Sequence, residues 1–481
     1  MADLVLSTEQ DVEDLAWGAC FQGIGGGGPV AEGTRLLKKA LAEYGPVRCQ
    51  NPADFPDDAW VVTVSFMGNR APLTPEQEEQ KKRLGLVEWK YDNNLAEALK
   101  FLEKVTGRVV SGIVPSELGG ANSPGPLSVA LSLGLTPLDG DYTGKAKPET
   151  RQGMPSIAGV PLTPMASADK WGNKCVIYEA VNNALGERLG KMLATGAFGN
   201  TAVAYFLIPG REMKKHIFAG TLTESFELGR AMRLAREAGR DVTPVVLERL
   251  GGRVLFRGVL ARKEWSVPDG YYVGTHEFEG EGEFAGHRYK VWFKNENHVT
   301  WFDGRPHVTT PDRVGQILTD TGLPVMTQEL AEGQRVTLIG VPSRARHREP
   351  DALAFMAPVI TGSTSTMCPW SGSRPDGAGL SPMRTSVCHK GREARFRRPL
   401  GLHPGKRPSA QAARAPSWRN VRTWLKLSLT NWKKVTAATK FCGGSPPPWK
   451  TANWWLCSAP AVAAKQPPYV ASRGLKSPIR G

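Results

Sequence analysis

The spacing of apolar residues over the first 160 positions changes repeatedly between a helical period and short continuous runs. The segments with helical character are 8–19, 31–45, 94–107 and 126–134. Thr8 is a suitable N-cap for the first of them, and Gly45 is typical of the residue that follows a helix C-terminus. The runs 60–66 and 108–115 are typical of buried strands. This alternation predicts an α/β domain with a mixed or parallel sheet covered by helices.

The pattern changes twice in the remainder of the chain. Residues 175–240 are predicted to be mostly helical. From Gly251 onward, short strand-like runs are separated by turn residues, which predicts an antiparallel sheet or a small barrel. We therefore expect an α/β N-terminal domain over 1–170, followed by a helical passage and a mostly-β, barrel-like second domain over 171–360.

Charge is distributed unevenly along the 481 residues, whose formal net charge is +15. Residues 361–481 contain 21 lysines and arginines but only two acidic residues, a net charge of +19. Residues 1–360 contain 40 basic and 44 acidic residues, a net charge of −4. The C-terminal segment also lacks a sustained apolar period, so we expect a disordered tail that is separate from the two domains.

Three interpretations of residues 361–481 stay open. Clustered basic residues and tryptophans fit a nucleic-acid-binding arm, because the former attract phosphates and the latter stack on bases. The composition also fits a basic extension without a specific role. Coding sequence read in the wrong frame would have the same composition, because it is not selected for folding.

Composition also restricts the class of protein. No apolar run approaches the ~20 residues that span a bilayer, and the acidic N-terminal segment lacks the layout of a signal peptide. A membrane or secreted protein is therefore not expected. The three cysteines before residue 361 are few and widely spaced, which predicts a cytoplasmic location. A homo-oligomer is possible, and nucleic acid is expected as a partner only through the tail.

A glycine-rich loop, residues 23–29, follows the first predicted helix. It matches the pattern G-x-G-x-x-G, but a helix precedes it where a dinucleotide fingerprint requires a strand. The glycines Gly25, Gly26, Gly27 and Gly28 expose backbone N–H groups just before a helix N-terminus, which suits an anion or a polarised carbonyl. A flexible joint between two helices is the alternative.

A second candidate segment, residues 116–122, follows the predicted strand 108–115. It places the carboxylate of Glu117 beside a Gly119-Gly120 turn and the amide of Asn122. Ligands bind at the carboxyl ends of strands in α/β sheets, so we expect this segment to contribute to a binding site.

Asp139 and Asp141 lie two residues apart on another predicted turn, and Lys145 and Glu149 follow them. Paired carboxylates can share a proton, hold a cation or position water. A solvated Asp-Gly turn is the alternative.

Residues 294–297, with the sequence KNEN, are predicted to lie on a strand of the second domain. Alternation would point Lys294 and Glu296 to one face, and Asn295 and Asn297 to the other. Two inward-facing amides need partners, which a bound ligand could supply. Neither the histidines of this domain nor the cysteines have the spacing of a metal motif, so a divalent metal is possible but not indicated.

The series of these segments resembles the S-methyl-thiohydantoin desulfurase family, formerly a domain of unknown function that is often called hydantoinase/oxoprolinase-associated. The similar stretches are LAWGACFQGIGGGGP (15–29), SELGGAN (116–122), LDGDYTGKAKPE (138–149), DKWGN (169–173), NNALGERLGKM (182–192), GTLTESFELGRAMRLAREAG (220–239) and KVWFKNENHVTW (290–301). No single stretch is specific, whereas the series in this order is. The resemblance implies an α/β N-terminal domain and a β-barrel-like second domain.

The resemblance further implies an enzyme that acts on a small five-membered cyclic imide or thio-imide. Water would attack the ring carbon that bears sulfur, a thiol would leave, and a hydantoin would remain. Asp139, Asp141 or Glu117 would take the proton from water. The substrate would contact the glycines and polar residues Gly25, Gly26, Gly27, Gly28, Gly119, Gly120, Asn122, Lys145, Glu149, Asn295, Glu296 and Asn297. The alternatives are a nucleic-acid-associated protein that uses the tail and a non-catalytic small-molecule-binding protein.

Overall fold

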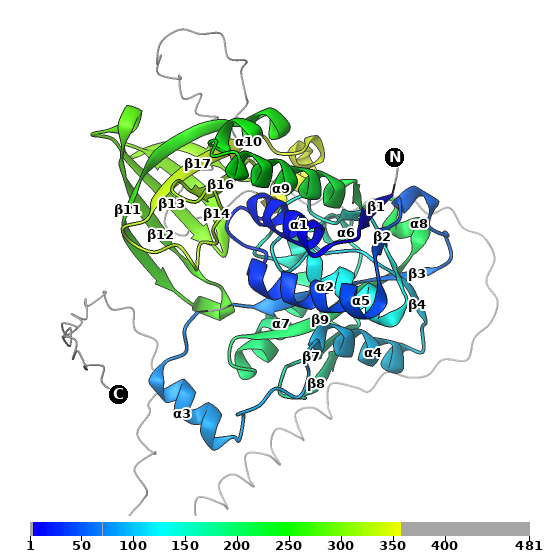
Figure 1. Ribbon diagram of the computed structural model, residues 1–481. Coiled ribbons are helices and arrows are strands. Elements are labelled where there is room, and N and C mark those ends of the chain that lie inside the picture. Colours follow the sequence, from blue (N-terminus) through cyan, green and yellow to red (C-terminus); the bar gives the residue numbers. More distant parts are fainter. Residues whose placement is uncertain (1–2, 70, 357–481) are drawn as a thin grey trace, which may run out of the picture. The chain divides into compact units, whose positions relative to one another are not determined.

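The computed structural model describes residues 3–69 and 71–356 (Figure 1). The predicted tail, residues 361–481, lies outside the described residues. Within the described part of the chain, no helix is long and apolar enough to cross a bilayer.

A six-stranded sheet forms the centre of the N-terminal half. Its strands, in spatial order, are β5 (Thr136–Pro137), β4 (Val110–Ile113), β3 (Trp60–Gly68), β9 (Asn200–Pro209), β7 (Met165–Ala168) and β8 (Lys174–Ile177). The neighbours β3, β4 and β5 are parallel, whereas β9 and β7 each pair antiparallel with both neighbours. The predicted mixed sheet of an α/β fold is therefore confirmed.

Helices pack on both faces of this sheet. Helices α4 (Asn94–Thr106) and α5 (Pro124–Leu133) lie on one face, and α7 (Asn183–Gly196) lies on the other. Helix α2 (Val30–Tyr44) packs on α5, and α1 (Glu9–Gln22) packs on α2 and on α9 (Thr221–Glu237). Leu95 and Leu99 of α4 pack against Val62 and Val64 of β3 in one core cluster. The predicted cap of the first helix is confirmed, because Thr8 and Asp11 form a capping box.

Residues 175–240 are less helical than predicted. They include β9, a ten-residue strand that pairs with both β3 and β7 at the centre of the sheet. The apolar run 202–208 within β9 is buried along nearly its whole length. Such a run has no distinct period, so its pattern does not separate a buried strand from a buried helix.

The second half contains a seven-stranded antiparallel sheet. Its strands, in spatial order, are β15 (Arg305–Thr309), β14 (Glu296–Phe302), β13 (Arg288–Lys294), β12 (Val273–Gly280), β11 (Arg253–Ser266), β17 (Arg335–Val341) and β16 (Arg313–Leu318). The expected barrel is wrong. Among the described residues the pairing ends at β15 and β16, so the sheet stays open.

Asn295 corrects the predicted alternation of the KNEN segment. It lies between β13 and β14 with φ of 59°, and its neighbours Lys294 and Glu296 pair across the two strands. The segment is therefore a tight turn rather than a continuous strand. Asparagine is one of the residues that adopt this left-handed conformation most readily.

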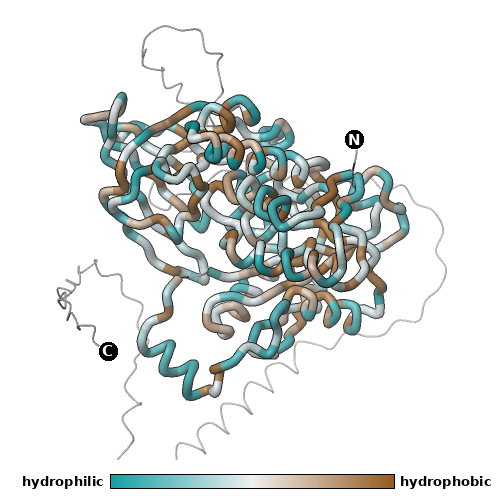
Figure 2. The backbone as a smooth tube through the Cα atoms, viewed as in Figure 1, coloured by the Kyte–Doolittle hydropathy of each residue, from teal (hydrophilic) through white to brown (hydrophobic). Residues whose placement is uncertain are grey.

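The smaller elements complete the fold. They are β1 (Leu4–Leu6), β2 (Val47–Cys49), β6 (Gly140–Asp141), β10 (Phe218–Ala219), α3 (Pro75–Arg83), α6 (Met154–Ile157), α8 (Gly210–Met213), α10 (Thr243–Leu250) and α11 (Pro350–Met356), with short 3-10 turns between them. Helix α3 has no buried residue, and its tube is hydrophilic throughout (Figure 2).

Helices α1 and α9 connect the two sheets (Figure 1). Val12 and Leu15 of α1 pack with Leu118 and Leu127 of the N-terminal half. The other side of this helix pair, with Phe21 of α1 and Leu228 and Met232 of α9, packs on strands of the second sheet. The helix pair thus contributes to the cores of both halves.

Two glycines let α1 and α9 approach each other closely. A Cβ atom on Gly229 would lie 1.8 Å from the carbonyl oxygen of Asp14, and a Cβ on Gly18 would lie 1.8 Å from that of Ser225. These neighbours are backbone atoms of packed helices, so they cannot move aside without separating the helices.

We expect G229A to lower the free energy of unfolding by about 1–3 kcal/mol, because overpacking a tight contact forces the backbone to shift. Urea denaturation measures this change. The matched control is G196A in α7, where an added Cβ meets no atom within 4 Å. That variant should have unchanged or slightly raised stability, by at most about 1 kcal/mol. Equal stabilities of G229A and G196A would contradict the proposed contact.

Candidate functional site

The glycine-rich loop between α1 and α2 is held by backbone hydrogen bonds from both halves of the molecule. Gly27 O accepts from Asn122 N at 2.9 Å and from Ala121 N at 3.1 Å. On the other side, Gly25 O accepts from Thr327 N at 2.9 Å, and Ile24 O accepts from Asn297 N at 3.0 Å. The loop is therefore a fixed part of the structure, and the alternative of a flexible joint is not supported.

Close packing of backbone against backbone explains the glycines of two predicted segments. A Cβ on Gly27 would lie 2.4 Å from the Cα of Gly119, and a Cβ on Gly119 would lie 2.3 Å from the Cα of Gly27. Gly27 also has φ of 78°, which favours glycine. Gly119 and Gly120 thus lie against the loop and its neighbouring helix rather than in the lining of the cavity described next.

A cavity of about 100 Å³ lies beside this loop. Its lining comes from the glycine loop, the ends of β3 and β9, the turn after β4, the segment 147–150, helix α7 and the β13–β14 turn. The lining residues are Gly25, Gly26, Gly27, Gly28, Ser65, Phe66, Met67, Gly68, Asn69, Ser116, Glu117, Asn122, Lys147, Pro148, Thr150, Glu187, Lys191, Asn200, Tyr205, Asn295, Glu296, Met326 and Gln328. Segments far apart in the sequence therefore meet at one small, polar cavity.

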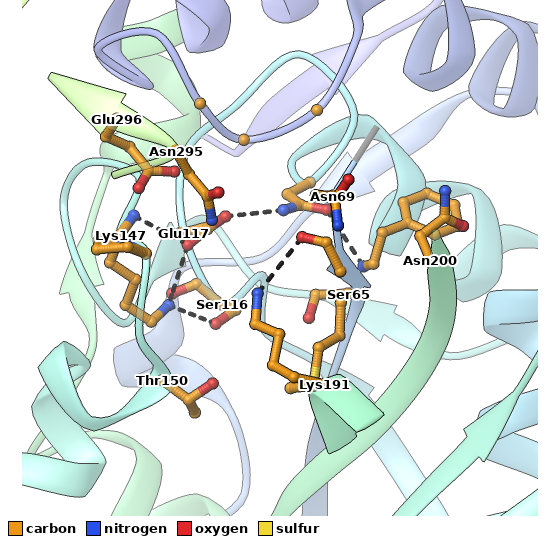
Figure 3. A pocket seen from close by; sticks show the side chains of 18 of the residues that line it. Ser65, Asn69, Ser116, Glu117, Lys147, Thr150, Lys191, Asn200, Asn295 and Glu296 are labelled. Carbon is orange, nitrogen blue, oxygen red and sulfur yellow. Dashed lines mark hydrogen bonds and ion pairs between the residues drawn. The ribbon is translucent and has the colours of Figure 1, made fainter. Parts of the chain in front are cut away.

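An ion pair with several hydrogen bonds forms one wall (Figure 3). Lys147 Nζ lies 3.3 Å from Glu117 Oε2 and donates to Ser116 Oγ at 2.6 Å and to Ser116 O at 3.0 Å. Asn122 Nδ2 donates to Glu117 Oε1 at 2.7 Å. Burial lowers the pKa of Lys147, but the interactions with Glu117, Tyr205 and Asp141 together outweigh burial, so the pKa is raised. The lysine is therefore a cation at neutral pH.

Helix α7 supplies a second carboxylate and a second lysine. Glu187 accepts from Thr150 N at 2.7 Å and from the hydroxyl of Tyr271 at 3.2 Å. Burial raises the pKa of Glu187 to about 7, although the nearby Lys191 opposes the shift. Burial lowers the pKa of Lys191. A carboxylate that titrates near neutral pH can exchange protons efficiently with a substrate or with water.

Glu296 is a third carboxylate, at the start of β14. It is 2% exposed, and its Oε2 has no hydrogen-bond partner among the described residues. A Cβ on Gly26 would lie 1.9 Å from its Oε1, so only glycine at position 26 leaves room for this side chain. Burial and the charge of Glu117 raise the pKa of Glu296 well above its usual value, although Lys145 and Lys191 oppose the shift.

Asp139 and Asp141 do not line the cavity. Asp139 accepts from Leu222 N, Thr223 N and Thr223 Oγ1 at the start of α9. Asp141 accepts from the backbone of its own turn and from Thr221 Oγ1 at 2.7 Å. Burial raises the pKa of Asp141 to about 6 despite these bonds. The structure gives the two aspartates the role of fixing a turn and the N-terminus of α9.

The other predicted site residues divide into two groups. Asn122, Asn295 and Glu296 line the cavity together with Glu117 and the glycines of the loop. Lys145, Glu149 and Asn297 lie outside the lining. Lys145 is fully buried and donates to Ala146 O, Glu149 pairs with Arg151 and Lys294, and Asn297 Nδ2 donates to Val314 O.

Ten polar residues of the lining had not been singled out from the sequence as candidates. They are Ser65, Asn69, Ser116, Lys147, Thr150, Glu187, Lys191, Asn200, Tyr205 and Gln328. Ser116 and Lys147 lie inside the quoted stretches SELGGAN and LDGDYTGKAKPE, and Glu187 and Lys191 lie inside NNALGERLGKM. Only their position within the stretches that resemble the family could have identified these four residues. The spacing of polar and apolar residues around them is the same as at an ordinary surface position.

No group of three or more His, Cys, Asp and Glu side chains within residues 3–69 and 71–356 is arranged to hold a metal ion.

Comparisons with known proteins agree with this arrangement. The S-Me-THD-like N-terminal domain matches residues 10–179, and the S-Me-THD-like C-terminal domain matches residues 181–369. A crystal structure of a protein from Chromobacterium violaceum has a TM-score of 0.57 and 23% sequence identity. The match covers 74% of this chain and 96% of that chain, which supports the fold alone. No curated protein is similar enough to count as a match.

The two domain matches together extend over most of the chain, and they follow the same order as the motifs quoted above. They include the glycine loop, the 116–122 turn, helix α7 and the β13–β14 turn, which together line the cavity. The chain therefore belongs to the S-Me-THD-like family, that of the S-methyl-thiohydantoin desulfurases.

Proposed function

We propose that this protein is an enzyme that hydrolyses a small cyclic thio-imide of the S-methyl-thiohydantoin type. Water supplies the oxygen that replaces sulfur on the ring carbon, methanethiol leaves, and a hydantoin remains. The observation that carries this proposal is the convergence of Glu117, Glu187 and Glu296 on one small cavity in a chain of this family.

The size and chemistry of the cavity suit a small flat ring. Its volume is about 100 Å³. A cavity of roughly 150 Å³ accommodates benzene, so a single five-membered ring is near the upper limit for this site. Asn122 Nδ2 donates to Glu117 Oε1 and Asn295 Oδ1 accepts from Tyr272 N, and the remaining amide hydrogens of both side chains are donors that the edge of an imide can use.

Hydrogen-bond donors near the cavity can stabilise the negative charge that develops on the ring during the attack. Gly27 and Gly28 line the cavity, and no acceptor for their backbone N–H groups is found among the described residues. The carboxyl group of Glu296 lies beside Gly26, and it is a further donor whenever it carries a proton, which its raised pKa favours. Fixed donors of this kind stabilise a developing negative charge more than water does, because they need no reorientation.

Glu187 is the residue best suited to take the proton from water. It lines the cavity, and its pKa of about 7 places it near the pH at which a general base is most efficient. Glu117, which the sequence had suggested together with the two aspartates, is bound by Lys147 and Asn122 through both oxygens. We therefore assign Glu117 to holding Lys147 in place.

We expect E187Q to lower kcat/KM for an S-methyl thiohydantoin by roughly 10²–10⁴-fold, because the amide cannot accept the proton. Release of methanethiol, followed with a thiol-trapping dye, measures the rate, and chromatography of the hydantoin confirms the product. The control is E248Q on α10, an exposed carboxylate outside the cavity. Equal rates for E187Q and E248Q would remove Glu187 from the mechanism. A wild-type protein that binds the compound without releasing thiol would favour a binding protein instead.

The activity should depend on pH through the same carboxylate. Because the pKa of Glu187 is raised to about 7, its basic form increases as the pH rises through 7. We expect kcat/KM to rise tenfold per pH unit below that value and to level off above it. In E187Q the residual activity should not show this rise of kcat/KM with pH. A wild-type profile that is flat between pH 5 and 8 would contradict the assignment.

A further inference from the structure

We propose that Ser116 is the nucleophile of this site, and that it forms a covalent bond to the ring before water acts. This inference rests on the proposed function and adds a step to it. It concerns a residue that lies directly after β4, at the carboxyl end of a parallel strand, where ligands bind in α/β sheets.

The hydroxyl oxygen of Ser116 receives two short hydrogen bonds. Lys147 Nζ donates to Ser116 Oγ at 2.6 Å, and the Tyr205 hydroxyl donates to it at 2.7 Å. Both donors hold the oxygen in place, and Lys147 can take the proton of Ser116 across the 2.6 Å contact once it has given one of its own to Glu117. Two donors, one of them charged, also stabilise the alkoxide that forms when this proton leaves.

The donors are themselves held in place. Lys147 is fixed by Glu117 Oε2 at 3.3 Å and by the carbonyl oxygen of Ser116 at 3.0 Å (Figure 3). Tyr205 on β9 lies 3.2 Å from Ser65 Oγ on the neighbouring β3. A nucleophile in contact with a basic side chain, which a third group orients, is the arrangement found in enzymes that form covalent intermediates.

The position of this group in the cavity allows it to reach a ligand. Ser116, Lys147, Glu117 and Tyr205 all belong to the lining of the same cavity. Ser116 is 2% exposed, so bulk water does not compete for its hydroxyl. Lys147 is also buried, so the contact between the two side chains lies inside the cavity and not at the protein surface.

The first step forms the bond between Ser116 Oγ and the ring carbon and breaks the bond between that carbon and sulfur. Lys147 first gives a proton to Glu117, and its neutral amine takes the proton of Ser116 across their 2.6 Å contact as the new bond forms. The departing thiolate takes a proton from the Lys147 ammonium and leaves as methanethiol, and Glu117 then returns its proton to Lys147. No oxidant or reductant is needed, because the ring carbon keeps its oxidation state.

The second step is the water attack of the proposed function, with Glu187 as its base. Water adds to the same ring carbon, the bond to Ser116 Oγ breaks, and Ser116 regains a proton. The oxygen of water remains as the carbonyl of the hydantoin. The sum of both steps is one substrate and one water converted to one hydantoin and one methanethiol.

Methanesulfonyl fluoride tests the nucleophile without the substrate, because it is small and sulfonylates activated serines with loss of fluoride. We expect one label per wild-type chain by intact mass, located on Ser116 by peptide mapping, and no label in S116A. K147M should label at least tenfold more slowly, and K147R should recover part of the rate because its charge remains. S266A, at an exposed serine on β11, is the control and should label like the wild type. Wild-type protein without a label on Ser116 would overturn the proposal.

Thiol release distinguishes a failure of this inference from a failure of the proposed function. We expect a burst of one methanethiol per active site, and a fall in kcat on the order of 10³-fold in S116A with its melting temperature unchanged. Steady thiol release without a burst, at equal rates in S116A, would overturn the nucleophile and leave the hydrolase intact. Labelling of Ser116 without any thiol release would support the nucleophile and reject the substrate.

Discussion

The close approach of two backbones underlies the whole site. The glycine loop lies so close to the 119–120 turn that a Cβ atom on Gly27 would overlap with Gly119, and a Cβ atom on Gly119 would overlap with Gly27. Asn122 N, Thr327 N and Asn297 N bind loop carbonyls from opposite sides, which fixes the loop between the mixed sheet and the antiparallel sheet. Every catalytic role that we assign depends on a wall of the cavity that this contact positions.

Burial of charge is the second constraint on the site. Several carboxyl and ammonium groups of the site are buried away from water. Burial raises the pKa of a carboxyl group and lowers that of an ammonium group, unless an opposite charge or a hydrogen bond stabilises the charged form. The folded-state pKa of Glu187 is raised from 4.5 to about 7, so the folded chain holds a proton that the unfolded chain has lost. Its contribution to stability therefore decreases as the pH rises between these two values. Burying Glu187 in the cavity therefore lowers the stability of the folded chain at neutral pH, and it gives the site a carboxyl group that gains and loses protons near pH 7.

The fold could be predicted from the sequence to the extent that its elements are periodic. Helices α2 and α4 follow from their apolar spacing, because each has one buried face. Strand β3 follows from a short continuous apolar run rich in valine, which favours a strand. Strand β9 has a continuous run as well, but it includes Ala202 and Ala204 and follows a helical stretch, so its pattern did not separate a buried strand from a buried helix. The open edge of the second sheet also has no local signal, because closure depends on whether β15 and β16 pair.

The site was predictable only in part, for a related reason. Glycines and turns mark where a chain bends, and the loop at 25–28 and the turn near Glu117 do meet at the cavity. Glu187 and Lys191, by contrast, are four residues apart on a helix, which is the spacing of an ordinary surface ion pair. Asp139 and Asp141 had the spacing of a catalytic pair, but their oxygens bind the turn and the N-terminus of α9. Only packing decides which carboxylate faces the ligand.

The arrangement of the glycine loop has a consequence for evolution of the active site. Because the same hydrogen bonds join the two halves and shape the cavity, the protein cannot enlarge its pocket by rotating one half away from the other. New substrate preferences must arise from exchanges of side chains on the rim, such as those at Asn69 and Asn200. The backbone around the ring can stay constant through a long series of such changes.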